Sequence, residues 1–173
     1  MKFRWGAIGL VGFLAVTLTA CGYHFAGSGD FPAGVSRVFI PILENRSAVT
    51  GLESIITNDL IYEFTRSRKE SLAQDRSSAD GILTGTIVSI SVENIARSTV
   101  STAVERRVTG ILNLRLESPD GRILWASGNI LERQAYSVVD GNKTATDQNK
   151  SDAIAVVSKK LAESAFNRLT DDF

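Results

Sequence analysis

The chain has 173 residues with 19 basic and 19 acidic side chains, so its formal net charge at pH 7 is zero. Balanced charge argues against a general nucleic-acid-binding protein, whose affinity depends on concentrated positive charge. The length suffices for one domain with a sizeable hydrophobic core. The single cysteine excludes an intramolecular disulfide.

The N-terminus has the parts of a secretory signal. Lys2 and Arg4 precede an apolar run over residues 7–18, which is shorter than the roughly 20 residues that a membrane-spanning helix needs. Residues 18–21, Leu-Thr-Ala-Cys, resemble the lipobox of bacterial lipoproteins. The resemblance implies cleavage before Cys21 and acylation of that residue. The alternative is an ordinary signal peptide that has a cysteine near its end by chance.

These features divide the chain into three parts. We expect residues 1–20 to be the signal peptide, residues 21–34 to be a lipidated N-terminus and tether, and residues 35–173 to fold as one α+β domain. Several acyl chains on Cys21 would hold the protein stably on a membrane, and we expect no cofactor besides this covalent lipid. Gly22 follows the cysteine, where lipoproteins retained in the inner membrane usually have aspartate. The resemblance therefore implies the outer membrane, on its periplasmic side.

The domain begins with a strand and a helix. Residues 35–43 are mostly apolar, which is typical of a buried strand, but Pro41 has no N–H and is expected at an edge of the sheet or at the end of the strand. Glu-Asn-Arg-Ser at residues 44–47 predicts a loop, which runs to residue 50. Apolar side chains then recur every four positions up to residue 67, which predicts a helix with one buried stripe. The stripe consists of Leu52, Ile56, Leu60 and Phe64.

A polar connection over residues 66–80 leads to three predicted strands, at residues 82–95, 104–117 and 122–138. Apolar and polar residues alternate along them, which indicates a sheet with one buried face and one solvated face. Residues 118–121, Ser-Pro-Asp-Gly, predict the hairpin turn between the last two strands. The apolar positions are Val88, Ile90 and Val92 in the first strand, and Val104, Val108, Leu112, Leu114 and Leu116 in the second.

Residues 139–151 are polar and predict a loop, and an apolar stripe over residues 152–169 predicts a last helix. The element order is therefore β-α-β-β-β-α. We expect a two-layer α+β sandwich, in which both helices pack on one face of a four-stranded mixed sheet. A right-handed crossover through the first helix makes the first two strands parallel. The loops at 44–50, 96–103 and 139–151 would then emerge at one end of the sheet.

The sequence offers little chemistry for catalysis. His24 is the only histidine and lies close to Cys21, and no cluster of His and Cys has the spacing of a metal site. Gly81 and Gly85 lie in an apolar strand rather than in a phosphate-binding loop. We therefore expect a non-enzymatic binding protein without a nucleic-acid partner.

Several short motifs resemble one family of binding proteins. They are Cys-Gly-Tyr-His-Phe at residues 21–25, the segment Val-Phe-Ile-Pro-Ile-Leu-Glu-Asn-Arg at 38–46, and Gly-Leu-Glu at 51–53. This is the family of lipopolysaccharide-assembly lipoproteins, the plug subunits of the outer-membrane lipopolysaccharide translocon. The resemblance covers nearly the whole mature chain. It implies a lipoprotein that binds lipopolysaccharide, helps a large β-barrel partner to assemble, and sits inside that barrel.

The resemblance also implies a ligand site, because basic residues near the loop tips of the sheet contact the glycolipid in that family. Arg97 lies in a matching turn, and Lys143 lies in the next loop. Arg46 and Lys150 are expected at the same end of the sheet because of the inferred strand directions. Arginine and lysine at such positions can pair with lipopolysaccharide phosphates through charge-assisted hydrogen bonds.

A second interpretation comes from residues 38–64 and from Ala-Asp-Gly-Ile-Leu-Thr-Gly-Thr at residues 79–86. These stretches also resemble lipoproteins that activate peptidoglycan synthases, and the curli-export pore lipoprotein. This interpretation implies a periplasm-facing regulator or a component of a secretion pore. Affinity pull-down from solubilised outer membrane distinguishes the two, since one predicts a large barrel and the other a synthase or a ring of copies.

Replacing the cysteine tests the predicted anchor. Cys21→Ala should leave an uncleaved or mislocalised precursor, because the chain has no second thiol to acylate. Membrane fractionation and incorporation of labelled palmitate measure this. A variant that still incorporates palmitate and fractionates with the outer membrane would contradict the lipoprotein interpretation.

Overall fold

The computed structural model describes residues 31–68, 71–97 and 104–171. The predicted signal peptide (residues 1–20), Cys21 and residues 22–30 lie outside the described residues. The described elements, in chain order, are η1 (Pro32–Gly34), β1 (Val38–Phe39), β2 (Glu44–Asn45), α2 (Leu52–Arg68), η3 (Arg76–Ser78), β3 (Gly81–Arg97), β4 (Val104–Glu117), β5 (Ile123–Val138) and α3 (Lys143–Asp171).

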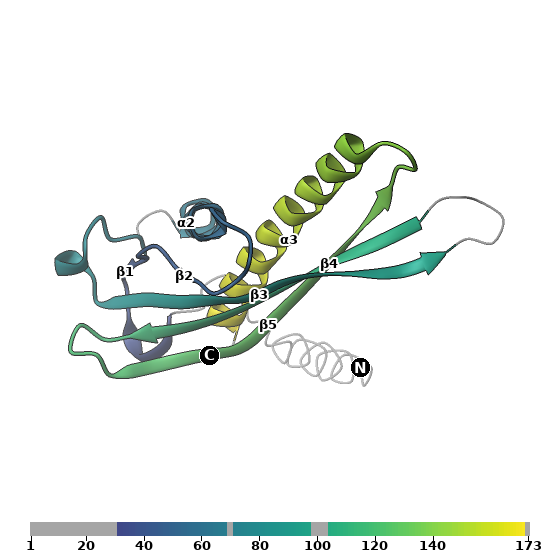
Figure 1. Cartoon of the computed structure of the whole chain (residues 1–173). Helices are drawn as coiled ribbons and strands as arrows, with labels where there is room; N and C mark the ends of the chain where they lie inside the picture. Colours follow the sequence, from purple (N-terminus) through teal and green to yellow (C-terminus); the bar gives the residue numbers. More distant parts are fainter. Residues whose placement is uncertain (1–30, 69–70, 98–103, 172–173) are drawn as a thin grey trace, which may run out of the picture.

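The strands form one mixed sheet in the order β1-β3-β4-β5, with β2 also paired to β3 (Figure 1). β1 and β2 run parallel to β3, while β3, β4 and β5 form a long antiparallel meander. The predicted α+β class, the parallel crossover and the helices on one face of a mixed sheet are thus confirmed. Residues 118–122 make the predicted turn, in which the N–H of Gly121 donates to the carbonyl of Ser118 at 2.8 Å.

The predicted first strand is split into two short pieces. β1 pairs with Gly81 and Ile82, and β2 pairs with Thr86 and Ile87. Between them the backbone leaves β3 around Pro41, which has no N–H for a ladder, and the N–H of Leu43 donates instead to Oγ1 of Thr57 in α2. The predicted loop was therefore wrong at residues 44–45, which form β2.

The core lies between the sheet and the two helices, which cover the same face (Figure 1). The predicted face of β4 is confirmed, since Val108, Leu112, Leu114 and Leu116 are all buried. α3 lies along β4 and β5, and α2 packs against α3, where the hydroxyl of Ser158 donates to Asp59. The opposite face of the sheet, which we call the outer face, carries the alternate residues, among them the exposed Arg115.

Side chains of α3 pack tightly against the backbone of Gly110, which the pattern of apolar residues does not single out. A Cβ built there would lie 2.6 Å from Cγ1 of Val157 and 3.0 Å from Cδ1 of Leu161. Real Cβ atoms do not approach so closely, so any other residue would force the side chain of Val157, or the helix that carries it, to shift. Gly110 therefore sets the distance at which α3 packs on β4.

One predicted core position on β3 was wrong. Val88 is exposed on the outer face, and it lies at a register shift between Ile87 and Ser89. Such a β-bulge inserts one extra residue and shifts the alternation that follows it. Ile87, not Val88, therefore supplies the buried side chain, while Ile90 and Val92 stay on the helix-covered face, opposite Gly110 and Val108.

The domain begins before the predicted boundary at residue 35. Phe31 is 3% exposed, and its ring stacks on Phe64 of α2 with centroids 5.6 Å apart. The guanidinium of Arg68 lies 5.5 Å above the same ring, a cation–π contact. Residues 31–34 thus belong to the folded domain rather than to the predicted tether 21–34.

α3 begins nine residues before the predicted start at residue 152. Asn142 caps it, since Oδ1 accepts a hydrogen bond of 3.0 Å from the N–H of Ala145. Thr146 ties the first turn back to the sheet, because its Oγ1 accepts from the N–H of Val139 at 3.0 Å. Residues 143–151 are polar because most of them are exposed, and not because they form a loop.

Charge reversal on the two faces of the sheet should have opposite effects. Leu112→Asp places a carboxylate in the fully buried position of Leu112 and should cost more than about 4 kcal/mol, enough to unfold many domains. Arg115→Asp, on the exposed outer face, should change the free energy of unfolding by less than about 1 kcal/mol. Chemical denaturation monitored by circular dichroism measures both, and equal losses would contradict the assignment of faces.

Candidate functional site

The sheet has two ends that differ in what they carry. We call the end where β3 finishes and β4 starts the distal end. There Arg97 pairs with Val104, and Val104 pairs with Val138 at the end of β5. The proximal end is the opposite one, where β4 finishes and β5 starts. The register confirms the predicted strand directions for the end that carries Arg97.

Lys143 lies at the distal end, as predicted from those directions. It is the first residue of α3 and follows the last residue of β5, Val138, by five positions. Its side chain is 88% exposed and forms an ion pair with Asp147 one turn along the helix. An exposed pair of this kind is worth about 1 kcal/mol or less, so Lys143 can exchange Asp147 for a stronger anion such as a phosphate.

Lys150 lies within α3, about 10 Å along the helix from Lys143 at 1.5 Å per residue. Its helical spacing from Ile154 and Val157 puts it on the side that faces the sheet, and it is half-buried. The predicted loop position of Lys150 was wrong, but the residue still belongs to the distal half of α3.

Arg106 is a distal cation that the sequence analysis missed. It lies on the helix-covered face of β4, pairs with Asn94 across the sheet, and donates from Nε to Oδ1 of Asn94 at 3.0 Å. The signal for it was present, because alternation along β4 puts a charged residue among the positions that are apolar elsewhere. That mismatch indicates that a charge interrupts the apolar, helix-covered face of β4 near the distal end.

Arg46 does not belong to the distal end, contrary to the prediction. Its N–H donates to the carbonyl of Ile87 at 3.0 Å, ten positions before Arg97 and therefore roughly 33 Å away along β3. β2 is only two residues long, so the chain leaves the sheet halfway along β3. Parallel direction alone therefore did not bring Arg46 to the tip.

Arg46 also has its charge compensated. Nε and Nη2 donate to the two carboxylate oxygens of Glu44 at 2.9 and 3.1 Å, and Thr86 donates to the same carboxylate at 3.2 Å. These bonds from Arg46 hold the pKa of Glu44 below its usual value, and Glu44 raises the pKa of Arg46 in turn. A paired guanidinium is a weaker attractor for an external anion than a free one.

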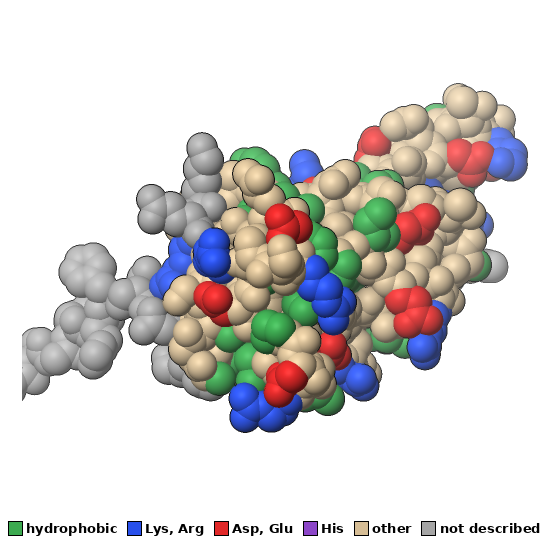
Figure 2. All heavy atoms as spheres, turned by 90° about the vertical axis from the view of Figure 1, so that its left-hand side faces the viewer, with side chains coloured by type: hydrophobic (Ala, Val, Ile, Leu, Met, Phe, Trp, Pro, Cys, Tyr) green, Lys and Arg blue, Asp and Glu red, His purple; other side chains and the backbone are tan. Residues whose placement is uncertain are grey.

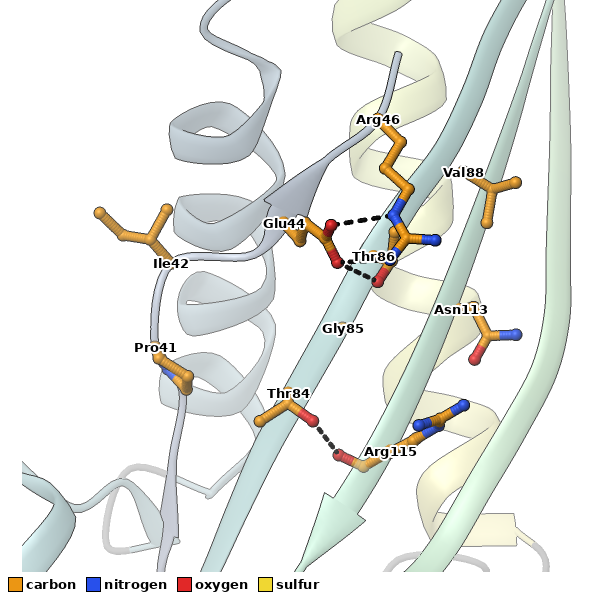
Figure 3. A pocket seen from close by; sticks show the side chains of 10 residues that line it. All are labelled: Pro41, Ile42, Glu44, Arg46, Thr84, Gly85, Thr86, Val88, Asn113 and Arg115. Carbon is orange, nitrogen blue, oxygen red and sulfur yellow. Dashed lines mark hydrogen bonds and ion pairs between the residues drawn. The ribbon is translucent and has the colours of Figure 1, made fainter.

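The Arg46–Glu44 pair borders a shallow groove of about 500 Å³ on the outer face (Figure 3). Figure 3 shows Pro41 and Ile42 on one side of β3, and Asn113 and Arg115 on the other. Ile42 is 70% exposed, so one side of the groove is apolar, while Thr84, Thr86 and Asn113 contribute hydroxyl and amide groups to its lining. The lining residues are Pro41, Ile42, Glu44, Arg46, Thr84, Gly85, Thr86, Val88, Asn113 and Arg115.

The proximal end carries charged residues of both signs. Figure 2 looks onto it and shows lysine and arginine interspersed with aspartate and glutamate, with apolar patches between them. Within residues 31–68, 71–97 and 104–171, no group of three or more His, Cys, Asp or Glu side chains could hold a metal ion. None of the described helices is both long and apolar enough to cross a membrane.

Comparison with known proteins identifies the fold and the family. A family model described as lipopolysaccharide assembly (LptE) matches residues 35–169. No curated protein sequence matches the chain.

Two solved structures share the fold at low sequence identity. An uncharacterized lipoprotein B from Nitrosomonas europaea has a TM-score of 0.56 and 15% identity, with 83% of this chain and 86% of that chain covered. A minor lipoprotein from Acinetobacter baumannii has a TM-score of 0.50 and 14% identity, with 80% and 93% covered. At this identity the likeness concerns the fold alone.

Proposed function

Because the chain belongs to the lipopolysaccharide-assembly family, we propose that it is a non-enzymatic outer-membrane lipoprotein that binds lipopolysaccharide and supports the β-barrel translocon for that glycolipid. In this proposal Cys21 carries the lipid, and the domain helps the barrel to assemble and plugs its lumen. The observation that carries the ligand part is the gathering of Arg97 and Lys143 at the distal end by the register of β3, β4 and β5.

The charges of the distal end suit a phosphate-bearing ligand. Lys143 is exposed and held only by a surface ion pair, so an incoming phosphate competes with one carboxylate rather than with a buried network. Arg106 and Lys150 add two half-buried cations to the distal half. Half-buried cations are less screened by salt than fully exposed ones and would hold an anion more firmly.

The outer face suits the plug part of the proposal. Its charged residues occur in both signs, with Glu93 and Arg107 paired at 3.3 Å. Hydroxyl and amide side chains, such as Thr86 and Asn113, lie between them in the middle of the sheet. A face of this kind stays solvated and is compatible with the polar interior of a wide barrel.

Pull-down from solubilised outer membrane tests the partner. The full-length protein with an affinity tag should recover a large β-barrel subunit in constant ratio. Recovery of a peptidoglycan synthase, or of a ring of this chain alone, would contradict the proposal and favour the regulator or secretion-pore interpretation.

Charge reversal at the distal end tests the ligand site. Arg97→Asp combined with Lys143→Asp should weaken binding of purified lipopolysaccharide by about tenfold or more, since roughly 1.4 kcal/mol is lost. The wild-type affinity should fall as salt rises, and the double variant should show a shallower dependence. Titration at several salt concentrations measures both quantities.

The matched control reverses two exposed cations at the proximal end. Arg115→Asp combined with Arg122→Asp makes the same change in net charge on exposed positions and should leave the affinity within about twofold, a change of less than roughly 0.5 kcal/mol. Equal losses in the two variants would show that net charge alone governs binding. An unchanged affinity in the distal variant would remove Arg97 and Lys143 from the site.

A further inference from the structure

The two edges of the sheet differ in whether their backbone groups have hydrogen-bond partners. At the β5 edge, side chains of α3 donate to backbone carbonyls that a neighbouring strand would otherwise use. Arg168 donates to the carbonyls of Ser127 and Asn129 at 2.8 and 3.2 Å, Lys160 to Arg133 at 3.4 Å, and Asn149 to Ser137 at 2.9 Å. An edge with its acceptors occupied does not add a strand readily.

These bonds also fix which way the backbone groups point across the whole sheet. Along an antiparallel strand, the backbone N–H and C=O groups of successive residues point alternately toward one neighbouring strand and toward the other. From Asn129 to Ser137 the odd-numbered residues of β5 present their carbonyls to the edge, so the backbone groups of even-numbered residues such as Ile130 point toward β4. The register then makes the even-numbered residues of β4 face β5 and the odd-numbered ones, such as Thr109, face β3.

The same alternation identifies the groups on the far edge of β3. Ser89, Ser91 and Glu93 are opposite Ile111, Thr109 and Arg107, so their N–H and C=O groups bond to β4. The backbone groups of Ile90, Val92 and Asn94 therefore point away from the sheet. This assignment agrees with the carbonyl of Ile87, before the bulge, which points outward to the N–H of Arg46.

No described residue pairs with this part of β3. β1 and β2 cover Gly81–Ile82 and Thr86–Ile87, and the segment after α2 covers β1 in turn, through the bridge between Val38 and Leu72. After β2 the chain leaves the sheet at Arg46, so neither β1 nor β2 continues alongside the later part of β3. The stretch from Ile90 to Asn94, which we call the open edge, is about the usual length of a β-strand.

Apolar side chains on both faces flank the open edge. Val92 lies on the helix-covered face beside the fully buried Val108, yet it is 40% exposed. Val88 is 41% exposed on the outer face just before the open edge. A strand added here would continue the line of β2, cover Val92 and extend the core by one strand.

We propose that the open edge accepts an extended segment of the barrel subunit, which adds to the sheet beside β3 by β-augmentation. This inference rests on the proposed function, since it names the segment's source. The segment would place apolar side chains beside Ile90 and Val92, and hydroxyl or basic ones beside Ser91 and Glu93. Glu93 pairs with Arg107 at 3.3 Å, but its side chain is 57% exposed next to the open edge. A surface pair of this kind is worth about 1 kcal/mol or less, so a basic neighbour can still pair with Glu93.

A second copy of this chain is a poorer occupant of the open edge, because it would bring a second Glu93 close to the first. Two β3 strands paired antiparallel about Val92 would set Glu93 opposite Ser91 and diagonal to the second Glu93. Diagonal neighbours on a sheet lie about 7–8 Å apart, and like charges in such pairs are destabilising. Charge therefore favours a different chain with a cation at this position.

Amide hydrogen exchange on the full-length lipoprotein, alone in detergent and in its co-purified barrel complex, tests the proposal. The amides of Ile90, Val92 and Asn94 should exchange at least about tenfold more slowly in the complex, as new hydrogen bonds form. The amides of Ser91 and Glu93 should be protected in both samples, because they bond to β4 throughout.

A pair of variants separates the backbone donor from the side chain. Val92→Pro removes the outward N–H, and proline is tolerated on an edge strand, so the isolated protein should keep its thermal midpoint. Val92→Thr keeps the N–H and the β-branched shape. Co-purified barrel should fall at least about fivefold with Val92→Pro and stay near the wild-type amount with Val92→Thr.

Each result decides the question. Unchanged exchange at Ile90, Val92 and Asn94 in an intact complex would overturn the open-edge proposal and leave the proposed function standing. Slow exchange at these amides in concentrated protein without the barrel would identify a second copy as the occupant and overturn it too. Absence of any barrel from the wild-type preparation would instead overturn the proposed function, and this proposal with it.

Discussion

The close approach of α3 to β4 at Gly110 is the contact on which the arrangement of the domain depends. With hydrogen in place of a side chain, the helix axis can come close enough for Val157 and Leu161 to fill the space above the sheet. That position lays α3 along β5, so its polar flank reaches the edge carbonyls through Asn149, Lys160 and Arg168. One glycine thus lets a single helix close both the core and one edge of the sheet.

The parts of the fold that could be predicted from the sequence are those in which burial is one-sided. β4 alternates cleanly because one face is covered by a helix and the other faces solvent, and the stripe on α2 repeats for the same reason. The first turns of α3 could not be predicted from apolar spacing, since residues 143–151 extend past the core. Only the cap at Asn142 marks their helical start. Val88 was misplaced because a bulge is not visible as a change of composition.

For the candidate site, the direction of each strand could be predicted from the sequence, but the length over which each strand stays paired could not. Strand direction follows from chirality and connection, so Arg97 and Lys143 could be placed at one end without coordinates. How far each strand runs depends on which backbone groups find partners, and Pro41 shortens the first strand so that Arg46 stops at mid-sheet. Arg106 was missed because the alternation predicts an apolar, buried face along the whole of β4, whereas Arg106 places a charge on that face in the distal half.

The anchoring of Phe31 in the core would determine how far the domain can move from a membrane that held a lipid on Cys21. Phe31 stacks on Phe64, and Val35 lies against Gly81 at the start of β3, so the folded chain begins at the proximal end. Nine residues lie between Cys21 and Phe31, so the chain between these two residues spans ten Cα–Cα steps, at most roughly 36 Å when fully extended. The 17 residues of β3 span roughly 55 Å. A lipid on Cys21 would therefore keep the proximal end within roughly 36 Å of the bilayer. The distal end lies one length of β3 farther along the domain, so the distal cations would reach farther from the bilayer than the linker alone allows.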